Sequence, residues 1–345
     1  MLADLKVLQL YGYPFDVGNT ENAVGFRYFS MGRHALSAGL TALGVGAGHS
    51  VLMPAFICRD LLAAVHSVGA QTLFYPVNER LAPDALPVDA SVKVVIAVNY
   101  FGFPQALDLF REYCVINGTT LVEDNAHGFL SRDEQGVLLG TRGDLGLFSL
   151  RKTFYWPDGA ALFVNRNTPG CHLPIALPCS KDSVSINFTV KRTLACIQNI
   201  TGVRVRSASE KLMRSIRKVR TGNELPSSLD QSEYEMPSHP AIHCKSLQML
   251  GKVDSTGEVC RRRALYLKFH KELAHLGIEP LFADLPEGVS PYGYPFRADA
   301  VRAGAVTDHA RHLGFDCSRW PDLPAAIADD APDFYRNVWW VNFLC

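Results

Sequence analysis

Strand-length apolar runs separated by helical segments constrain the fold of this chain more than any other feature. The runs lie at residues 51–54, 72–75, 92–98, 120–122 and 145–150. Crossovers of a dozen or more residues join them, and parallel strands need connections of that length. The pattern therefore predicts an α/β fold, with a mainly parallel sheet and helices on its faces.

Charged residues follow two of these runs directly. Glu123 and Asp124 come after the run at 120–122, and Arg151 and Lys152 come after the run at 145–150. Each feature alone is most often structural, a turn, a helix cap or a solvated edge. The carboxyl ends of parallel strands open onto one ligand crevice, however, so the acid and the base are expected to meet there. Pyridoxal phosphate needs both, a lysine for its Schiff base and an acid that keeps the pyridine nitrogen protonated.

A helix is predicted near residues 31–43, ended by the glycines that follow. Gly32, Arg33 and His34 lie at its N-terminus. Free backbone N–H groups and the helix dipole make such an end a phosphate site, although many helices begin with glycine. This position is the predicted place for a cofactor phosphate.

Composition excludes several classes of protein. The 34 basic and 34 acidic residues balance, which argues against a nucleic-acid partner. The apolar runs are too short to cross a membrane, and the first residues lack a signal-peptide pattern, so a cytoplasmic location is expected. The nine cysteines show no zinc-ligand spacing, so reduced thiols and no metal are expected.

Several motifs occur in a specific order. They are G-R-H-A-L-S-A-G-L-T-A-L-G-V-G-A-G-H-S-V-L-M-P-A-F, V-N-Y-F-G-F-P, E-D-N-A-H-G and G-D-L-G-L-F-S-L-R-K-T-F-Y-W-P-D-G-A. Together they resemble the DegT/DnrJ/EryC1/StrS family of PLP-dependent sugar aminotransferases. The resemblance implies the type I PLP-dependent aminotransferase fold, with a PLP-binding large domain at residues 1–225 and a small C-terminal α/β domain at 226–345. It also implies a homodimer.

The resemblance assigns roles to the charged strand ends. Lys152 is expected to form the Schiff base and to carry the proton at the substrate carbon, and Asp124 to pair with the pyridinium nitrogen. His127 stands where the family has glutamine, near the ring's face or its phenolic oxygen.

The remaining cofactor contacts also follow from the resemblance. Ser149 is expected to bond the phosphate together with the backbone of Gly32 and Arg33. Phe56 is the candidate for the aromatic residue that stacks on the ring, because the aligned position holds Cys58.

The chain departs from the family pattern in three places. The spacer between Ser149 and Lys152 is about two residues shorter than the usual family form. Glu233 and Glu235 occupy the segment where the family has N-Y-R-M-S, so a contact with the phosphate is expected to be lost or rebuilt with Arg33, because like charges repel. The chain also stops at N-F-L-C, where relatives continue, and a shortened C-terminus is expected.

The expected function is transfer of an amino group, most plausibly from glutamate to a keto group on a nucleotide-linked sugar. A sugar dehydratase is the first alternative, but those of the family replace the lysine with histidine, and Lys152 is present. A non-catalytic relative that binds PLP or a sugar nucleotide is the second. The two glutamates at 233 and 235 favour it, and the Asp124–Lys152 pair disfavours it.

The second half of the chain carries weaker patterns. Helices are predicted at residues 185–209, 211–219, 257–276 and 298–313, a linker at 221–242 and a strand at 291–296.

Overall fold

The computed structural model describes residues 25–166, 168, 170, 171, 174–182, 188–190 and 230–344. The predicted helix at 211–219 and the predicted boundary at residues 225 and 226 lie outside these residues. The predicted helix at 185–209 and the linker at 221–242 are described only in part. The division into two domains at that boundary stays a prediction.

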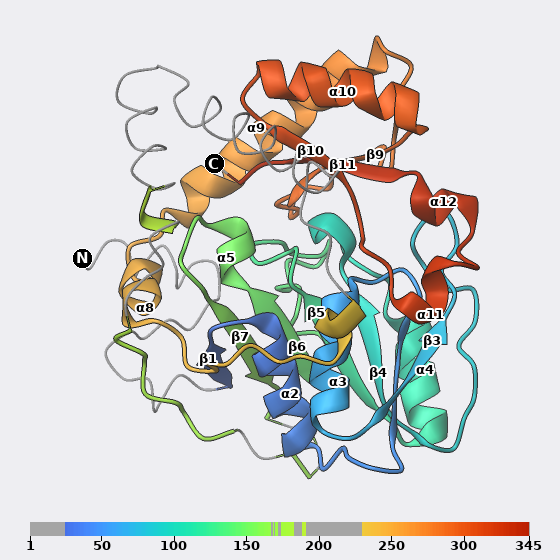
Figure 1. Cartoon of the computed structure of the whole chain (residues 1–345), viewed down its shortest axis with the longest axis vertical. Helices are drawn as coiled ribbons and strands as arrows, with labels where there is room; N and C mark the ends of the chain where they lie inside the picture. The colour runs from blue at the N-terminus through green and yellow to red at the C-terminus, as the bar shows by residue number, and fades with distance from the viewer. Residues whose placement is uncertain are drawn as a thin grey trace.

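A seven-stranded sheet forms the larger part of the fold (Figure 1), in the order β1-β7-β6-β5-β4-β2-β3. The strands from β3 to β6 are parallel, and β7 and β1 add an antiparallel edge. This confirms the predicted α/β fold. The strands are β1 (Phe26–Phe29), β2 (Ser50–Pro54), β3 (Gln71–Tyr75), β4 (Val92–Val98), β5 (Thr120–Asn125), β6 (Leu145–Ser149) and β7 (Ala160–Val164).

The predicted helices connect these strands and cover the sheet. Helix α2 (Gly32–Ala42) packs against β6 and β7 and beside α3 (Leu62–Ser67), and α4 (Asp108–Asn117) packs on β4 and β5. Their apolar faces bury the core, in which Leu36, Leu40 and Val94 have almost no exposed surface. The central strands are apolar on both faces because helices cover both, as a parallel sheet requires.

A four-stranded antiparallel sheet, in the order β10-β11-β9-β8, forms the smaller part near the C-terminus. Figure 1 shows it in orange and red beside α9 (Ser255–Ala274) and α10 (Ala300–His312), at the upper end of the large sheet. Both helices begin at an aspartate cap, Asp254 and Asp299. The strands are β8 (Glu279–Pro280), β9 (Gly293–Arg297), β10 (Asp316–Arg319) and β11 (Val338–Asn342).

Short helical turns complete the described chain. None of the helices in the described ranges has the length and hydropathy needed to cross a membrane. The turns are η1 (Arg59–Leu61), η2 (Tyr100–Gly102), α5 (Leu150–Thr153), η3 (Asp230–Glu233), α8 (Cys244–Leu250), α11 (Ala325–Ala328) and α12 (Asp333–Arg336).

The prediction that the cysteines are reduced is wrong for one pair. Cys179 and Cys244 form a disulfide, which ties residue 179 to the first residue of α8. The pair is 65 residues apart in sequence and has no C-x-x-C or other short spacing, so no local pattern marks it. The other described cysteines are free.

A buried ion pair anchors the strand that carries the predicted acids. The carboxylate of Glu123, which has no exposed surface, accepts from Nη2 of Arg142 at 2.6 Å and from Nδ2 of Asn99 at 2.8 Å. Alternation along β5 turns Glu123 away from Asp124, so the two consecutive acids serve different places. Glu123 is therefore a structural residue.

Arg142→Met is expected to destabilise the fold by about 3 kcal/mol, because it leaves the buried carboxylate of Glu123 without its cation. Arg111→Met is the matched control, since the Arg111–Asp108 pair is exposed and is expected to cost less than about 1 kcal/mol. Urea denaturation of both variants measures the difference. Equal losses would contradict the assigned role of the buried pair.

Candidate active site

A cavity opens at the carboxyl ends of the central parallel strands, where the sequence predicts a crevice. The N-terminus of α2, the segment before η1 and the small antiparallel part close its sides. The lining residues are Met31, Gly32, Arg33, Ile57, Cys58, Asp60, Leu61, Val98, Asp124, Ala126, His127, Leu147, Ser149, Arg151, Lys152 and Trp320. Six of the eight predicted site residues line this one cavity.

Lys152 contacts His127 inside the cavity, with Nζ and Nε2 3.2 Å apart. The backbone N–H of Phe101 donates to Nδ1 of His127 at 3.3 Å, which leaves the ring proton of a neutral imidazole on Nε2. That proton points at Nζ of Lys152, so the amine must accept it with a free lone pair. The hydrogen-bond pattern therefore fits an uncharged lysine beside an uncharged histidine.

The electrostatic environment acts in the same direction on both groups. Burial lowers the pKa of Lys152 below its usual 10.5, an effect that Arg151 adds to and that Cys58 and Asp124 oppose. Burial, and then the positive charge of Lys152, lowers the pKa of His127 well below 6.5. A neutral amine is the form that attacks a carbonyl carbon, so this lysine is prepared for covalent chemistry.

Aromatic rings hold His127 in place. Tyr292, which precedes β9, stacks on the imidazole with ring centroids 4.4 Å apart, and Trp340 of β11 stacks on Tyr292 at 4.4 Å. Trp320 packs edge-on at 5.1 Å. Phe101 has a positive φ of 53°, an unusual conformation for a residue with a side chain, and its N–H reaches Nδ1 of His127 in that conformation.

Asp124 lies at the end of β5 and lines the same cavity as Lys152. One carboxylate oxygen accepts from the backbone N–H of Ala126 at 2.9 Å. Burial raises the pKa of Asp124, while the Ala126 N–H and Lys152 oppose the rise. A buried carboxylate with a raised pKa is suited to share a proton with a nitrogen base.

The N-terminus of α2 offers a place for an anion. The backbone N–H groups of Gly32 and Arg33 make no hydrogen bond within the described chain, and Met31 provides no side-chain cap. Ser149, the residue before α5, lines the cavity with them. The guanidinium of Arg33 donates to Asp60 at 2.8 Å, so its charge is already paired.

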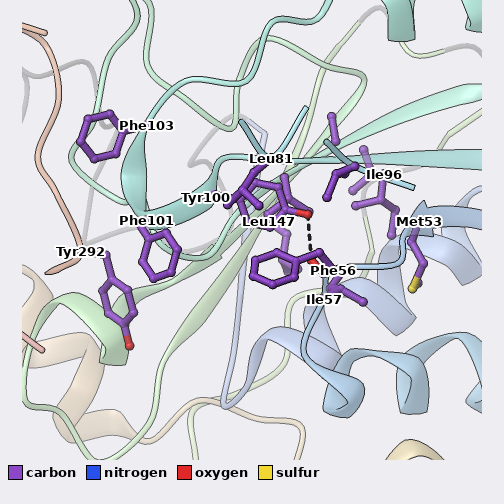
Figure 2. Packing of buried hydrophobic residues seen from close by; sticks show 14 of the residues in the cluster. Met53, Phe56, Ile57, Leu81, Ile96, Tyr100, Phe101, Phe103, Leu147 and Tyr292 are labelled. Atoms are coloured by element: carbon purple, nitrogen blue, oxygen red, sulfur yellow. Dashed lines mark hydrogen bonds between the residues drawn. The ribbon is translucent and has the colours of Figure 1, made fainter. Parts of the chain in front are cut away.

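Two predicted cofactor residues do not line the cavity. Phe56 has no exposed surface and packs among core rings, and its carbonyl accepts from the Tyr100 hydroxyl at 2.8 Å, as Figure 2 shows. The ring of His34 is buried in α2, and burial lowers its pKa. The prediction that Phe56 stacks on a cofactor is therefore corrected, since Cys58 lines the cavity from the same segment.

Glu233 makes structural contacts within this chain, and the expectation that a phosphate contact of this segment is lost or rebuilt with Arg33 stays a prediction. Its carboxylate is buried, accepts from the N–H of Ala325 at 2.7 Å and pairs with Arg59 at 3.3 Å. The neighbouring Tyr234 stacks on His66. Glu233 therefore joins η3 to the start of α11, and Arg33, the residue predicted to rebuild the phosphate contact, pairs with Asp60.

The small antiparallel part supplies residues that sequence reasoning missed. The buried Arg262 of α9 donates to the carbonyl of Thr153 at 2.7 Å and to the carbonyl of Tyr292 at 2.9 Å. It thereby joins the turn that carries Lys152 to the residue that stacks on His127. Tyr292 and Trp320 lie in the aromatic motifs P-Y-G-Y-P-F and S-R-W-P, the only local signal that could have indicated them.

The described residues contain no group of three His, Cys, Asp or Glu side chains placed to hold a metal ion. The functional groups present are instead an amine whose pKa is lowered, a buried carboxylate and backbone N–H groups without a hydrogen-bond partner in the described chain. These groups fit pyridoxal phosphate, which carries an aldehyde, a basic ring nitrogen and a phosphate.

Comparison with known proteins bears on the predicted resemblance. Residues 20–167 match the model of the DegT/DnrJ/EryC1/StrS aminotransferase family. Over this stretch the chain is similar to that family. The match includes α2 and the ends of the parallel strands that line the cavity, so the resemblance predicted from the motifs is confirmed there.

Curated proteins are similar to this chain over a part of its length. The 3-amino-5-hydroxybenzoate synthase of Amycolatopsis mediterranei is 30% identical over 125 residues, which cover 35% of this chain and 32% of the relative. Protein MosB of Rhizobium meliloti is 29% identical over 147 residues, which cover 41% and 28%. The chain thus spans about a third or less of the length of these relatives.

Solved structures share the fold over nearly the whole chain. The aminotransferase TlmJ from Streptoalloteichus hindustanus superposes with a TM-score of 0.62 at 20% identity, covering 99% of this chain and 89% of TlmJ. DesV of S. venezuelae, solved in complex with a ketimine intermediate, gives a TM-score of 0.59 at 18% identity, with coverages of 99% of this chain and 88% of DesV. The type I aminotransferase fold is thus shared with these proteins.

Lys152→Met is expected to stabilise the cofactor-free protein at neutral pH, and the gain should shrink as the pH rises. The unfolded chain binds a proton at this amine up to about pH 10.5, while the folded chain releases it at lower pH, so wild-type stability rises with pH in that window. Above this pH window the unfolded chain also carries a neutral amine, so burying the lysine no longer costs a proton. Only the difference in packing between lysine and methionine then remains.

Guanidinium denaturation of both proteins at several pH values between 7 and 11 measures this change. Lys252→Met is the control, because that side chain is exposed and its replacement should give no pH-dependent gain. A difference between Lys152→Met and wild type that stays constant over the window would show that the amine is not forced toward neutrality.

Proposed function

We propose that this protein is a PLP-dependent aminotransferase. The observation that carries the proposal is the hydrogen-bond arrangement at Lys152, where an imidazole N–H points at a buried amine in the cavity that Asp124 also lines. The names of the relatives and structural neighbours support the same reaction class. The cofactor would supply a covalent link to an amine and an electron sink for the charge at a neighbouring carbon.

Lys152 would first attach the cofactor through Nζ and then, once released, hold and return the proton of the substrate carbon. Its lowered pKa favours the neutral amine that both tasks need. Asp124 would keep a proton on the ring nitrogen, because a buried carboxylate is stabilised by a cationic N–H partner. His127, fixed by Tyr292, would orient the Lys152 amine and contact the cofactor ring.

The phosphate of the cofactor would bind at the start of α2. The backbone N–H groups of Gly32 and Arg33 and the hydroxyl of Ser149 are the donors that line the cavity there. The 11-residue α2 adds its dipole to these contacts. Trp320 and Tyr292, from the small antiparallel part, would exclude water from the reacting side.

The finer proposal names the substrates and the assembly. Glutamate is the proposed amino donor, and a keto group on a nucleotide-linked sugar is the proposed acceptor. We also propose a cytoplasmic homodimer, the assembly that the family resemblance predicts. Solved structures of similar fold include Spr1654 from Streptococcus pneumoniae, a protein proposed to be a sugar aminotransferase, in its PLP and PMP forms.

The wild-type protein incubated with PLP is expected to gain a visible absorption band that borohydride fixes to Lys152, as peptide mass spectrometry will locate. Lys152→Ala should lose the fixed label and at least about 100-fold of the transamination rate, because a positioned proton carrier contributes about that much. Lys252→Ala, an exposed lysine, should keep both. Label on any other lysine of the wild type would overturn the assignment of Lys152.

Incubation with glutamate and a panel of keto-sugar nucleotides is expected to give a product slightly heavier than the keto form, because NH and two further hydrogens replace the oxygen atom. Mass spectrometry of the products reads the acceptor directly. Asp124→Asn should retain PLP but lose about 100-fold or more of the rate, since the ring nitrogen would no longer hold its proton. Turnover of non-sugar ketones alone would remove the nucleotide-sugar proposal.

A further inference from the structure

The charged residues that line the cavity are paired, with one exception. Arg33 pairs with Asp60 at 2.8 Å, Lys152 contacts His127, and Asp124 accepts from the Ala126 N–H. The side chain of Arg151 makes no hydrogen bond or ion pair with any residue that the structure describes. Its Nε is buried and has no acceptor there.

A guanidinium that lines a cavity without an acidic partner is expected to bind an anion. Arginine stays charged in proteins and presents five N–H donors in a planar fork. A buried N–H donor without an acceptor costs free energy. A ligand that brings oxygen atoms to this donor removes that cost and so binds more tightly. The fork matches a carboxylate, which can accept two parallel hydrogen bonds.

The position of Arg151 identifies which anion. It directly precedes Lys152 in α5, and its charge acts on Lys152, on Tyr292 and on Asp158. The amine nitrogen of a donor must come to the reacting end of Lys152, and in an α-amino acid the carboxylate carbon lies about 2.5 Å from that nitrogen. The cofactor phosphate has its own donors at the start of α2.

Resting on the proposed function, we propose that Arg151 binds the α-carboxylate of the amino donor and so selects α-amino acids over simple amines. The contact would turn the α-carbon toward Lys152, the residue proposed to move its proton. Arg151 is thus a specificity-determining residue that the described side chains of the protein leave free for a substrate.

The first test compares L-glutamate with 4-aminobutanoate, which lacks the α-carboxylate but keeps the distal one. Stopped-flow absorbance of the PLP-loaded protein gives the apparent Kd of each donor. Arg151→Met is expected to raise the Kd of glutamate by about 10- to 100-fold, the loss of one charge-assisted pair, and to change that of 4-aminobutanoate much less. Arg151→Lys should recover part of the loss, because it keeps the charge without the fork.

The second test uses maleate, an unreactive dicarboxylate, and titration calorimetry of the cofactor-free protein. Wild type and Arg166→Met, which removes an exposed arginine, should bind maleate alike, and Arg151→Met should lose at least tenfold in affinity. This arm does not depend on PLP chemistry. A wild type that takes up no PLP but binds maleate through Arg151 would overturn the proposed function and leave the carboxylate site standing.

Two results would overturn the inference itself. One is a glutamate and maleate Kd in Arg151→Met within twofold of wild type. The other is a weakened affinity for PLP with unchanged donor binding, which would assign the guanidinium to the cofactor phosphate. Circular dichroism of each variant confirms that it folds.

Discussion

The contact between Lys152 and His127 is the interaction on which the site depends. It favours the uncharged form of both groups, because the backbone N–H of Phe101 occupies one imidazole nitrogen and leaves the other to donate to the amine. A protonated lysine would instead have to donate to a nitrogen that already carries a hydrogen. The hydrogen-bond pattern and burial therefore both favour the neutral form of the amine.

That pattern depends in turn on a strained backbone. Phe101 and Gly102 both have positive φ, and a side chain at Gly102 would meet the carbonyl of Ser290 at 2.8 Å. The close approach brings the segment before β9 against the large sheet, and the Tyr292 N–H donates to the carbonyl of Phe101 at 2.8 Å. The same short segment thus orients His127 and positions the ring that stacks on it. This gives a physical reason for the glycine of the N-Y-F-G motif.

The parts of the site that lie on the parallel sheet could be predicted from sequence, and the parts that depend on long-range packing could not. Asp124 and Lys152 each follow an apolar run, and adjacent parallel strands bring such ends together by a general rule. Tyr292 and Arg262 reach the site from more than 100 residues away in sequence, and no local pattern indicates where the small sheet docks. Phe56 was mispredicted for a related reason. Sequence alone does not show which side chain of this segment faces the cavity, and in the structure Cys58 does so while the ring of Phe56 packs into the core.

Arg151 and Lys152 show how one short turn can hold two cations in different states. Burial can lower the pKa of a lysine amine far enough for the amine to lose its proton. The pKa of a guanidinium is so high that the group keeps its charge. Arg151 also lowers the pKa of Lys152, so the fixed cation helps to make its neighbour neutral. An anion bound at Arg151 would weaken that effect and raise the proton affinity of Lys152. The arrival of a substrate carboxylate would therefore prepare the lysine to accept a proton from the adjacent carbon.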